Sequence, residues 1–434
     1  MKTSRYSSNS TVFYFTAGMA VRNNMFRGRS PALAGRSGGD ERQSGSRGGA
    51  RNYQSIFACV LADLKLKNSE KPQPRSGHRI AADEGNLYSF GGYNPAGRQR
   101  EGSLYRELWK FNLATKRWTL LKHGDSCPEE TASHSMLLMG SSLLVAFGTG
   151  FPFGEKCSNQ LHVYHIPSAK WQTVTCGGDM PSPRYGQSMT LKDGSVFVMG
   201  GTTGFNYNMK VYRLNFETLH WEDTSPSTSV FPGQDGDETP APRYRHEVAT
   251  SGNWLYVLGG GTAQICFNFE VVPSYNTQTK KWANMTAQPC PRTGQFPPAR
   301  KFHAAVQHAN FAYMFGGFDG DAIMFNDIWR LDLSNLQWTK MWQTLPQEIY
   351  FHTATTTPAG CMYVFGGVTT ANGATRSNHV FKMWLTMPTL QELVWDRICE
   401  KHPKLLANLE TPANRAAMRA QGIMLPRLFY SRLD

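Results

Sequence analysis

Apolar and polar positions alternate between Ala299 and Trp338 over short runs that turn residues separate. Three of these runs, FHAAVQ, FAYMFGG and DIWRLDL, are each long enough for one strand, and Trp338 opens a fourth. Short alternating runs bounded by glycine, asparagine and aspartate are typical of antiparallel strands. The segment therefore predicts a unit of four short strands.

The same pattern recurs along the chain. A glycine pair, or a degenerate form of it, follows an apolar strand in six places, beginning at Gly91, Gly148, Gly200, Gly259, Gly316 and Gly366. The steps between these glycines are 57, 52, 59, 57 and 50 residues. A period of this length is too long for WD40 blades and fits kelch blades.

Two further positions keep the same register. A polar residue precedes the glycine pair by 13 or 14 positions, as His78, His134, Gln187, His246, His303 and His352. A tryptophan follows that pair by 21 to 27 positions, as Trp118, Trp171, Trp221, Trp282 and Trp338. The pattern resembles the kelch repeat, which implies an all-β fold, a six-bladed kelch β-propeller. Each unit has two apolar faces that only neighbouring blades can bury, so we expect the tryptophans to lie between blades.

Residues 52–387 are expected to form this propeller. Its blades are predicted at residues 74–121, 130–174, 183–224, 243–285, 300–341 and 350–385. The sixth unit has Leu390 where a tryptophan would open its fourth strand. We therefore expect a strand at Tyr53–Leu61 to pair with the last blade and close the ring, which would remove an exposed strand edge.

Residues 1–51 differ in composition from the rest of the chain. They hold one Lys and eight Arg against Asp40 and Glu41, so they carry +7 of the total charge of +13. The stretch Gly35–Arg51 is rich in Gly, Ser and Arg and has too little apolar content to fold. We expect a disordered basic tail, and we favour a solvated linker over an RGG-like RNA-binding segment. The modest remaining charge does not argue for specific binding to nucleic acid.

The sequence predicts neither a catalytic residue nor a cofactor. The eight cysteines include no C-x-x-C pair, so neither zinc nor a redox dithiol is suggested, and a reducing compartment is expected. Phosphate loops, nucleophile elbows and the HExxH motif do not occur. Kelch propellers include a copper oxidase family, but the histidines here belong to the repeat register, and no metal site is expected. Thr11–Val21 is too interrupted by polar residues for a secretion signal, and no run approaches a membrane span.

Residues 388–434 have a different character and predict helices. Thr389 and Glu392 form a capping box, and the helix that they open should end near His402. Four apolar residues lie at helical spacing along it, namely Leu390, Leu393, Val394 and Ile398. A second helix is predicted with Thr411 as N-cap, Pro412 as first residue and Gly422 beyond its end. A third follows at Leu425–Leu433.

Two motifs in this segment resemble known docking sequences. TLQELVWDRI resembles the BC box that binds elongin C, with Val394 in the place of the motif's cysteine. The elongin C contacts implied are Leu390, Leu393, Val394 and Ile398. LPRLFYSRL resembles the cullin-2 box, and the cullin-2 contacts implied are Leu425, Pro426, Phe429 and Leu433. From about Pro74 to its end, the chain resembles the kelch domain-containing protein 10 family, kelch-repeat substrate receptors of a cullin-2 ubiquitin ligase.

The resemblance implies a non-catalytic protein. The propeller would capture the C-termini of substrate proteins, small or glycine-ending ones in receptors of this kind. The terminal helices would bind elongin C with elongin B, and cullin-2 with its RING subunit, in the cytoplasm and nucleus, without a membrane. The alternative is a kelch-propeller scaffold or signalling adaptor that binds a protein partner without ligase activity.

Recognition of a free C-terminus needs cationic donors in a concave site. The first strands of all six units converge on the central opening, and Arg245 is the stand-out there because the other units place Gly, Ser or Phe at its position. The expected site is Arg245, Tyr244, Tyr185, Phe302, Lys301, Phe351, Arg98 and Arg100. We interpret the recurring histidines as structural. The recurring arginines Arg75, Arg184, Arg243 and Arg300 are interpreted as pairing with neighbouring blades.

Overall fold

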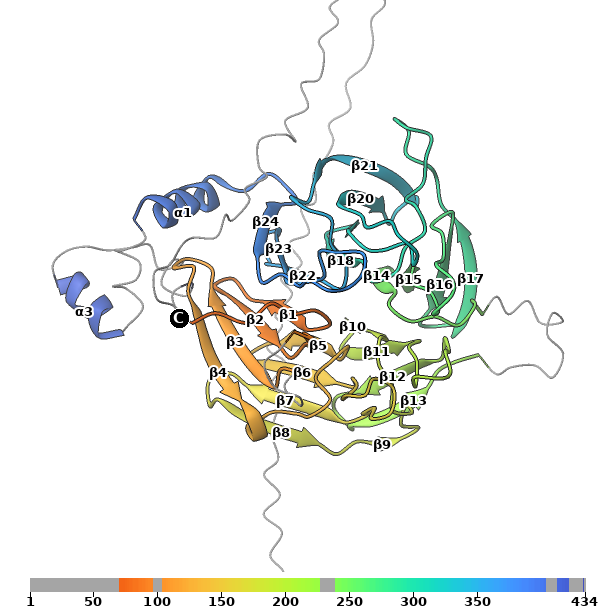
Figure 1. The fold of residues 1–434 in the computed structure, drawn as a ribbon, viewed down its shortest axis with the longest axis horizontal. Helices are drawn as coiled ribbons and strands as arrows, with labels where there is room; N and C mark the ends of the chain where they lie inside the picture. The colour runs from red at the N-terminus through yellow and green to blue at the C-terminus, as the bar shows by residue number, and fades with distance from the viewer. Residues whose placement is uncertain (1–69, 97–103, 227–238, 403–411, 421–431, 433–434) are drawn as a thin grey trace, which may run out of the picture. The chain divides into compact units, whose positions relative to one another are not determined.

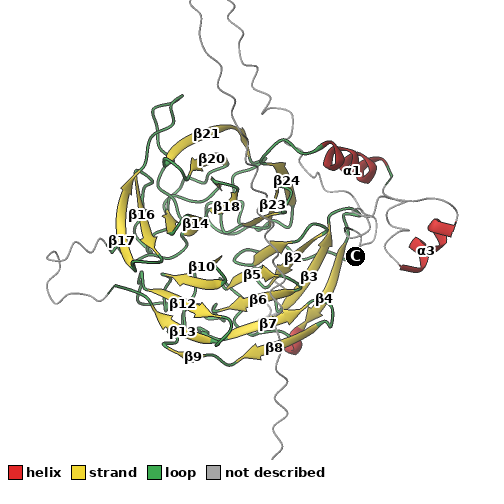
Figure 2. Cartoon of the chain, turned by 180° about the vertical axis from the view of Figure 1, so that it is seen from behind, coloured by secondary structure: helices red, strands yellow, loops and turns green. Residues whose placement is uncertain are grey.

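The computed structural model describes residues 70–96, 104–226, 239–402, 412–420 and 432. Its strands form six separate sheets around a central axis (Figures 1 and 2), and consecutive strands pair as antiparallel neighbours in each sheet. The innermost strands of neighbouring sheets contact one another around the whole ring, the first with the last included. The six-bladed β-propeller predicted from the repeat is confirmed.

The first three blades run from the centre outward in chain order. Blade one consists of β1 (Arg79–Ala82), β2 (Asn86–Phe90), β3 (Glu107–Asn112) and β4 (Trp118–His123). The 3-10 helix η2 (Gly124–Ser126) leads to blade two, which consists of β5 (Ser135–Met139), β6 (Ser142–Ala146), β7 (Leu161–His165) and β8 (Lys170–Val174). Blade three consists of β10 (Ser188–Lys192), β11 (Ser195–Met199), β12 (Val211–Asn215) and β13 (His220–Asp223), with β9 (Gly177–Gly178) in parallel beside β13.

The other three blades repeat this order. Blade four consists of β14 (Glu247–Ser251), β15 (Trp254–Leu258), β16 (Val271–Asn276) and β17 (Lys281–Thr286). Blade five consists of β18 (Ala304–His308), β19 (Phe311–Phe315), β20 (Asp327–Asp332) and β21 (Gln337–Thr344). Blade six has three described strands, β22 (Thr353–Thr356), β23 (Cys361–Phe365) and β24 (Val380–Trp384). The closing strand predicted at Tyr53–Leu61 lies outside the described residues.

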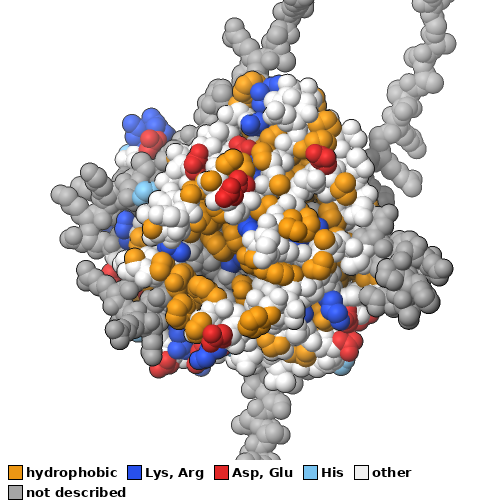
Figure 3. All heavy atoms as spheres, turned by 45° about the vertical axis from the view of Figure 1, so that its right-hand side comes forward, with side chains coloured by type: hydrophobic (Ala, Val, Ile, Leu, Met, Phe, Trp, Pro, Cys, Tyr) orange, Lys and Arg blue, Asp and Glu red, His pale blue; other side chains and the backbone are white. Residues whose placement is uncertain are grey.

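The hydrophobic core lies between blades. Leu87 of blade one and Phe365 of blade six, for example, belong to one buried cluster. Trp338 of blade five is fully buried, and its indole N–H donates to the carbonyl of Phe269 in blade four at 3.1 Å. The tryptophans therefore lie between blades, as predicted, where each fully buried apolar side chain contributes about 1.5–3 kcal/mol. Some apolar side chains nevertheless remain at the surface, among isolated charged ones (Figure 3).

The recurring histidines pack against the glycine pairs of the preceding blade. A Cβ added to the first glycine would approach a histidine Cε1 to 3.0 Å or less at Gly91, Gly200, Gly259, Gly316 and Gly366. The histidines at these junctions are His134, His246, His303, His352 and His78. These glycines also have φ between +56° and +69°, so lack of space excludes other residues and the backbone conformation disfavours them. The contact between Gly366 and His78 joins blade six to blade one.

The recurring arginines hold their own blades together. All four are buried, and Nη1 of each donates to the carbonyl of the first glycine of its own blade at 2.9–3.1 Å. The expected pairing with neighbouring blades is made by the backbone and not by the guanidinium groups: the carbonyl of each arginine accepts from a glycine N–H of the preceding blade at 2.8–3.1 Å. Each arginine lies just before the first strand, and the antiparallel second strand ends at the glycine, so the two positions are adjacent within one sheet. Arg300 also forms an ion pair with Asp327 of its own blade.

Two helices follow the propeller. Helix α1 (Leu390–Lys401) begins after Thr389, whose side chain accepts a hydrogen bond from the Glu392 N–H at 3.3 Å, and its C-cap is His402. The predicted N-cap Thr389 and the predicted end of this helix are confirmed, whereas the Glu392 carboxylate of the expected capping box binds Arg432. Helix α3 (Pro412–Ala420) begins at the proline that the sequence placed in its first position. The predicted N-cap Thr411, Gly422 and all of the predicted third helix except Arg432 lie outside the described residues.

Burial sets the charge state of the recurring histidines. It lowers the pKa of His134, His246, His303 and His352 to about 3, because a charged ring would lose its hydration between the blades. In an unfolded chain the pKa would be about 6.5. The unfolded state therefore binds more protons, and stability that is complete above about pH 6.5 is lost as the pH falls toward 3.

We predict that His352→Gln makes the fold less sensitive to acid. Glutamine is neutral at both pH values, and blade three has a buried Gln187 at this register position. Between pH 7 and pH 5, one such histidine costs about 2 kcal/mol of stability, a cost that glutamine does not have. Denaturant unfolding at both pH values should show a smaller loss for the variant by about this amount. Equal losses in the two proteins would contradict the assignment.

Candidate functional site

Six residue pairs at the inner ends of the blades surround the central axis. We call them the inner ring: Ser76-Gly77, Ala132-Ser133, Tyr185-Gly186, Tyr244-Arg245, Lys301-Phe302 and Tyr350-Phe351. The first residue of each pair forms a β-bridge with the residue that follows the glycine pair of its blade. The second residue has φ between +54° and +68° in all six pairs. Five backbone hydrogen bonds of 2.7–3.2 Å connect these second residues from blade to blade, so the ring is held rigidly.

Arg245 is the one cation among the second residues of the inner ring. Its guanidinium carbon lies 4.5 Å from the ring centroid of Phe351, and Nη2 donates to the Ser133 hydroxyl. Its Nε is buried and has no hydrogen-bond partner within the described part of the chain. Burial lowers the pKa of Arg245 to about 10, which leaves it cationic at neutral pH. No ion pair joins it to any carboxylate of the described residues, so its charge is available to an anionic ligand.

The four aromatic residues expected around Arg245 do lie together. Tyr185 and Tyr244 meet edge to face with ring centroids 6.4 Å apart, and Tyr244 meets Phe302 in the same way at 5.7 Å. Phe302 stacks on Phe351 at 4.0 Å. The rings thus form a continuous aromatic wall from blade three to blade six, with the Arg245 guanidinium over Phe351 and the Lys301 ammonium 5.7 Å from the Phe302 centroid.

The other cations expected in the site are Lys301, Arg98 and Arg100, and Lys301 is not placed as Arg245 is. Lys301 is 4% exposed, and its Nζ donates to the carbonyls of Thr262 at 2.8 Å and Ala263 at 3.0 Å. These bonds give Lys301 a structural role, since they fix the neighbouring loop and occupy its ammonium group. Arg98 and Arg100 lie outside the described residues. Among the expected cations that the structure describes, Arg245 is therefore the one whose charge is free to bind an anionic ligand.

Helix α1 has one face on the propeller and one face in solvent. Trp395 and Cys399, four residues apart, are the buried residues of the helix. On the other side Leu390, Leu393 and Val394 are 77%, 36% and 45% exposed, and Ile398 is half-buried. Most of the apolar stripe identified from the sequence therefore faces solvent, and the helix packs on the propeller through Trp395 and Cys399. The packing face was missed, although the spacing of Trp395 and Cys399 was a signal for it.

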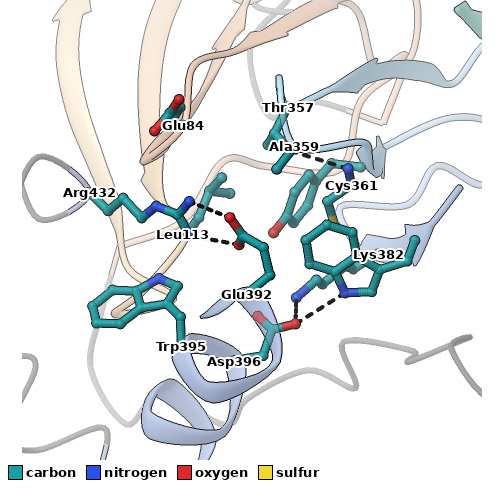
Figure 4. A pocket seen from close by; sticks show the side chains of 12 residues that line it. Glu84, Leu113, Thr357, Ala359, Cys361, Lys382, Glu392, Trp395, Asp396 and Arg432 are labelled. Atoms are coloured by element: carbon teal, nitrogen blue, oxygen red, sulfur yellow. Dashed lines mark hydrogen bonds and ion pairs between the residues drawn. The ribbon is translucent and has the colours of Figure 1, made fainter. Parts of the chain in front are cut away.

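Polar contacts complete the attachment of α1. Asp396 accepts hydrogen bonds from the Lys382 ammonium and from the Trp384 indole N–H, the latter at 3.2 Å, both on β24 (Figure 4). Because these donors come from the third strand of blade six, the helix has a fixed orientation relative to that blade.

Arg432, near the end of the chain, joins the helix to blade one. Its guanidinium binds both carboxylate oxygens of Glu392 at the wall of a small pocket (Figure 4), with one N···O distance of 2.7 Å. Its backbone carbonyl accepts from the Asn112 side chain at 3.3 Å, and its Cα lies so close to Gly85 that a Cβ there would approach it to 2.8 Å. No sequence pattern pointed to this clamp. The expected cullin-2 contacts Leu425, Pro426, Phe429 and Leu433 are outside the described residues.

The described residues contain no group of three or more His, Cys, Asp or Glu side chains placed to hold a metal ion. Among the same residues, no helix is both long and apolar enough to cross a membrane.

Comparisons with known proteins agree with this architecture. Residues 59–201, 97–295 and 246–403 match the KLHDC2/KLHL20/DRC7 Kelch-repeats domain. The chain is 41% identical over 365 residues to Kelch domain-containing protein 10 of Mus musculus, covering 83% of this chain and 81% of that protein. It is 38% identical to the Drosophila melanogaster homolog, over 79% of this chain and 60% of that protein. Kelch domain-containing protein 3 of Rattus norvegicus is 25% identical over 62% of this chain and 70% of that protein.

We predict that Arg432→Ala loosens α1. The Arg432 and Glu392 side chains are 6% and 12% exposed, and breaking such a buried ion pair costs about 3–5 kcal/mol. Hydrogen exchange at residues 390–401 should rise by about two orders of magnitude or more, while exchange in blades three to five stays unchanged.

The matched control lies in the same helix. Arg397 pairs with Glu400, and these side chains are 63% and 67% exposed, so Arg397→Ala should cost less than about 1 kcal/mol. Equal exchange in the two variants would show that Arg432 does not hold the helix.

Proposed function

This chain belongs to the kelch domain-containing protein 10 family, and from that membership we propose that it is the substrate receptor of a cullin-2 ubiquitin ligase. Its propeller would bind the C-terminal tails of other proteins at the inner ring. Helix α1 and the segment after it would bind elongin C, with elongin B, and cullin-2, with its RING subunit. Ubiquitin transfer would be the work of these partners, in the cytoplasm and nucleus, and this chain would have no catalytic residue.

The observation that carries the ligase proposal is the outward face of α1. Leu390, Leu393 and Val394 are exposed on a helix that Trp395 and Asp396 hold against the propeller. A row of apolar side chains on a helix fixed in this way favours a partner with a complementary groove. Burial of each side chain would contribute about 1.5–3 kcal/mol. The BC-box-like sequence lies on this same helix, so the exposed residues are those that the motif would use.

We predict that Leu390→Asp abolishes co-purification with elongin B and elongin C, because a carboxylate would have to be buried in the partner's apolar groove. Pro426→Ala should lose cullin-2 alone. Leu191→Asp is the matched control, since Leu191 is a 40% exposed leucine on β10, far along the chain from α1.

Native chain that captures neither partner would contradict the ligase proposal. The alternative, a kelch-propeller scaffold or adaptor without ligase activity, would then account for the inner ring and leave α1 to another partner. Loss of elongin in both leucine variants would instead mean that α1 is not the specific contact.

The proposal for tail binding is supported by Arg245 and its aromatic wall. A C-terminal carboxylate is an anion that a guanidinium can bind through two parallel hydrogen bonds. The neighbouring rings would limit access of water to that ion pair. The wall also restricts the space beside the carboxylate, which suits the small or glycine-ending C-termini implied by the family resemblance.

We predict that Arg245→Ala weakens the binding of such peptides by about 2–5 kcal/mol, because their carboxylate would be left without its partner. Fluorescence anisotropy with a glycine-ending peptide measures this loss. Amidation of the peptide's C-terminus should weaken native binding to a similar extent. Arg213→Ala, at an arginine on β12 that is 39% exposed, is the control. Undiminished affinity in folded Arg245→Ala protein would remove Arg245 from the site.

A further inference from the structure

Five exposed apolar side chains lie in four successive loops. These loops connect the second and third strands of blades two to five. The residues are Phe151, Phe153, Phe205, Ile265 and Ile323, with exposed fractions of 51%, 45%, 82%, 52% and 58%. We call these five residues the apolar rim. Isolated exposed apolar residues are ordinary, but a series at equivalent positions of neighbouring blades marks an interaction surface.

Direct contact joins the first two of these loops. Gly154 and Gly204 pack so closely that a Cβ on Gly154 would lie 2.9 Å from the Cα of Gly204. Phe153 and Phe205 are the residues adjacent to these glycines, so they flank the point where the loops meet. The two phenylalanines are therefore carried by loops that touch.

Hydrogen bonds join the remaining loops. The Ala263 N–H donates to the Tyr207 hydroxyl at 3.1 Å, which connects the loops of blades four and three. The Cys266 thiol donates to the carbonyl of Asp319 at 2.9 Å, which connects the loops of blades four and five. The rim is thus an arc carried by four interlocked loops.

The rim borders the inner ring. Tyr207, in the loop that carries Phe205, lies 5.2 Å from Tyr244 between ring centroids. Lys301 of the inner ring is bonded to the loop that carries Ile265. The arc does not extend over blade six, because the corresponding loop there, residues 369–376, contains no large apolar residue.

We propose that the apolar rim binds bulky apolar side chains in the segment that precedes a captured C-terminus. The inference rests on the proposed tail-binding function. With its carboxylate at Arg245, an extended tail would leave the inner ring over blades two to five, where Phe205, Phe153 and Ile265 can cover Leu, Phe or Trp side chains. The occupant is therefore a C-terminal peptide with an anionic end and an apolar upstream segment. The inner ring would bind the terminal carboxylate. The rim would favour, among proteins with the same C-terminal residue, those with apolar side chains upstream of it.

The test uses the full chain and synthetic peptides of about ten residues, which span roughly 33–36 Å when extended. All end in glycine with a free carboxylate. The parent peptide has serine at every upstream position, and each member of the series has one leucine in place of one serine. Affinities are measured for native protein, for Phe205→Ser and Phe153→Ser, and for Trp342→Ser as control, because Trp342 is 61% exposed on β21 outside the rim.

We expect leucine at one or more upstream positions to tighten native binding by about tenfold or more, the effect of burying one such side chain. Phe205→Ser or Phe153→Ser should reduce this gain to less than about threefold and leave the parent's affinity unchanged. The Trp342→Ser protein should behave as native. These side chains are exposed, so the variants are expected to fold, and equal thermal unfolding temperatures would establish it.

Two outcomes overturn the rim separately from the tail-binding function. Equal affinity for parent and leucine peptides, with binding still dependent on the free carboxylate, removes the rim and keeps the function. Sedimentation that shows self-association of native protein, abolished by Phe205→Ser and unaffected by peptide, would assign the rim to a second copy of this chain. Absence of carboxylate-dependent binding for every peptide removes the tail-binding function and the rim with it.

Discussion

The contact on which the structure depends is the one between a histidine ring and the first glycine of the preceding blade. A Cβ at Gly366 would lie 2.3 Å from the His78 ring, so any larger residue would force blades six and one apart. Repeated around the ring, this contact sets how closely the blades approach one another. Five backbone hydrogen bonds then connect the inner ring from blade to blade. With the blades at this spacing, Arg245 of blade four contacts Ser133 of blade two and Phe351 of blade six.

The repeat could be predicted because its recurring residues have the same role in each blade. The first glycine lies where no larger residue fits, and the tryptophan packs between two sheets. Where the recurring residues are replaced, the replacements occur on both sides of one junction between two blades. Blade two has Phe147 with φ +64° where the other blades have their first glycine, and blade three has Gln187 in place of histidine. Both departures fall at the same junction, so Gly148 corresponds to the second glycine and not to the first. The clamp between Arg432 and Glu392 joins positions 40 residues apart and follows no period, so only the structure reveals it.

The proposed function makes use of two surfaces on one rigid support. The inner ring and apolar rim lie at the strand ends around the axis, while α1 is attached to blades six and one through Asp396 and, by way of Glu392, through Arg432. A tail held by Arg245 and a partner held by Leu390 would therefore keep a constant separation. A fixed geometry of this kind favours transfer between bound partners, because neither has to search for the other.

The most direct test of the proposed function is reconstituted ubiquitin transfer. The chain would be combined with elongin B and C, cullin-2 and its RING subunit, ubiquitin with its activating and conjugating enzymes, and a carrier protein ending in a glycine tail. The account predicts that the carrier is ubiquitinated only when the chain is present and the carrier's C-terminal carboxylate is free. Assembly of the complete complex without modification of the carrier, or modification that does not depend on the free carboxylate, would contradict it.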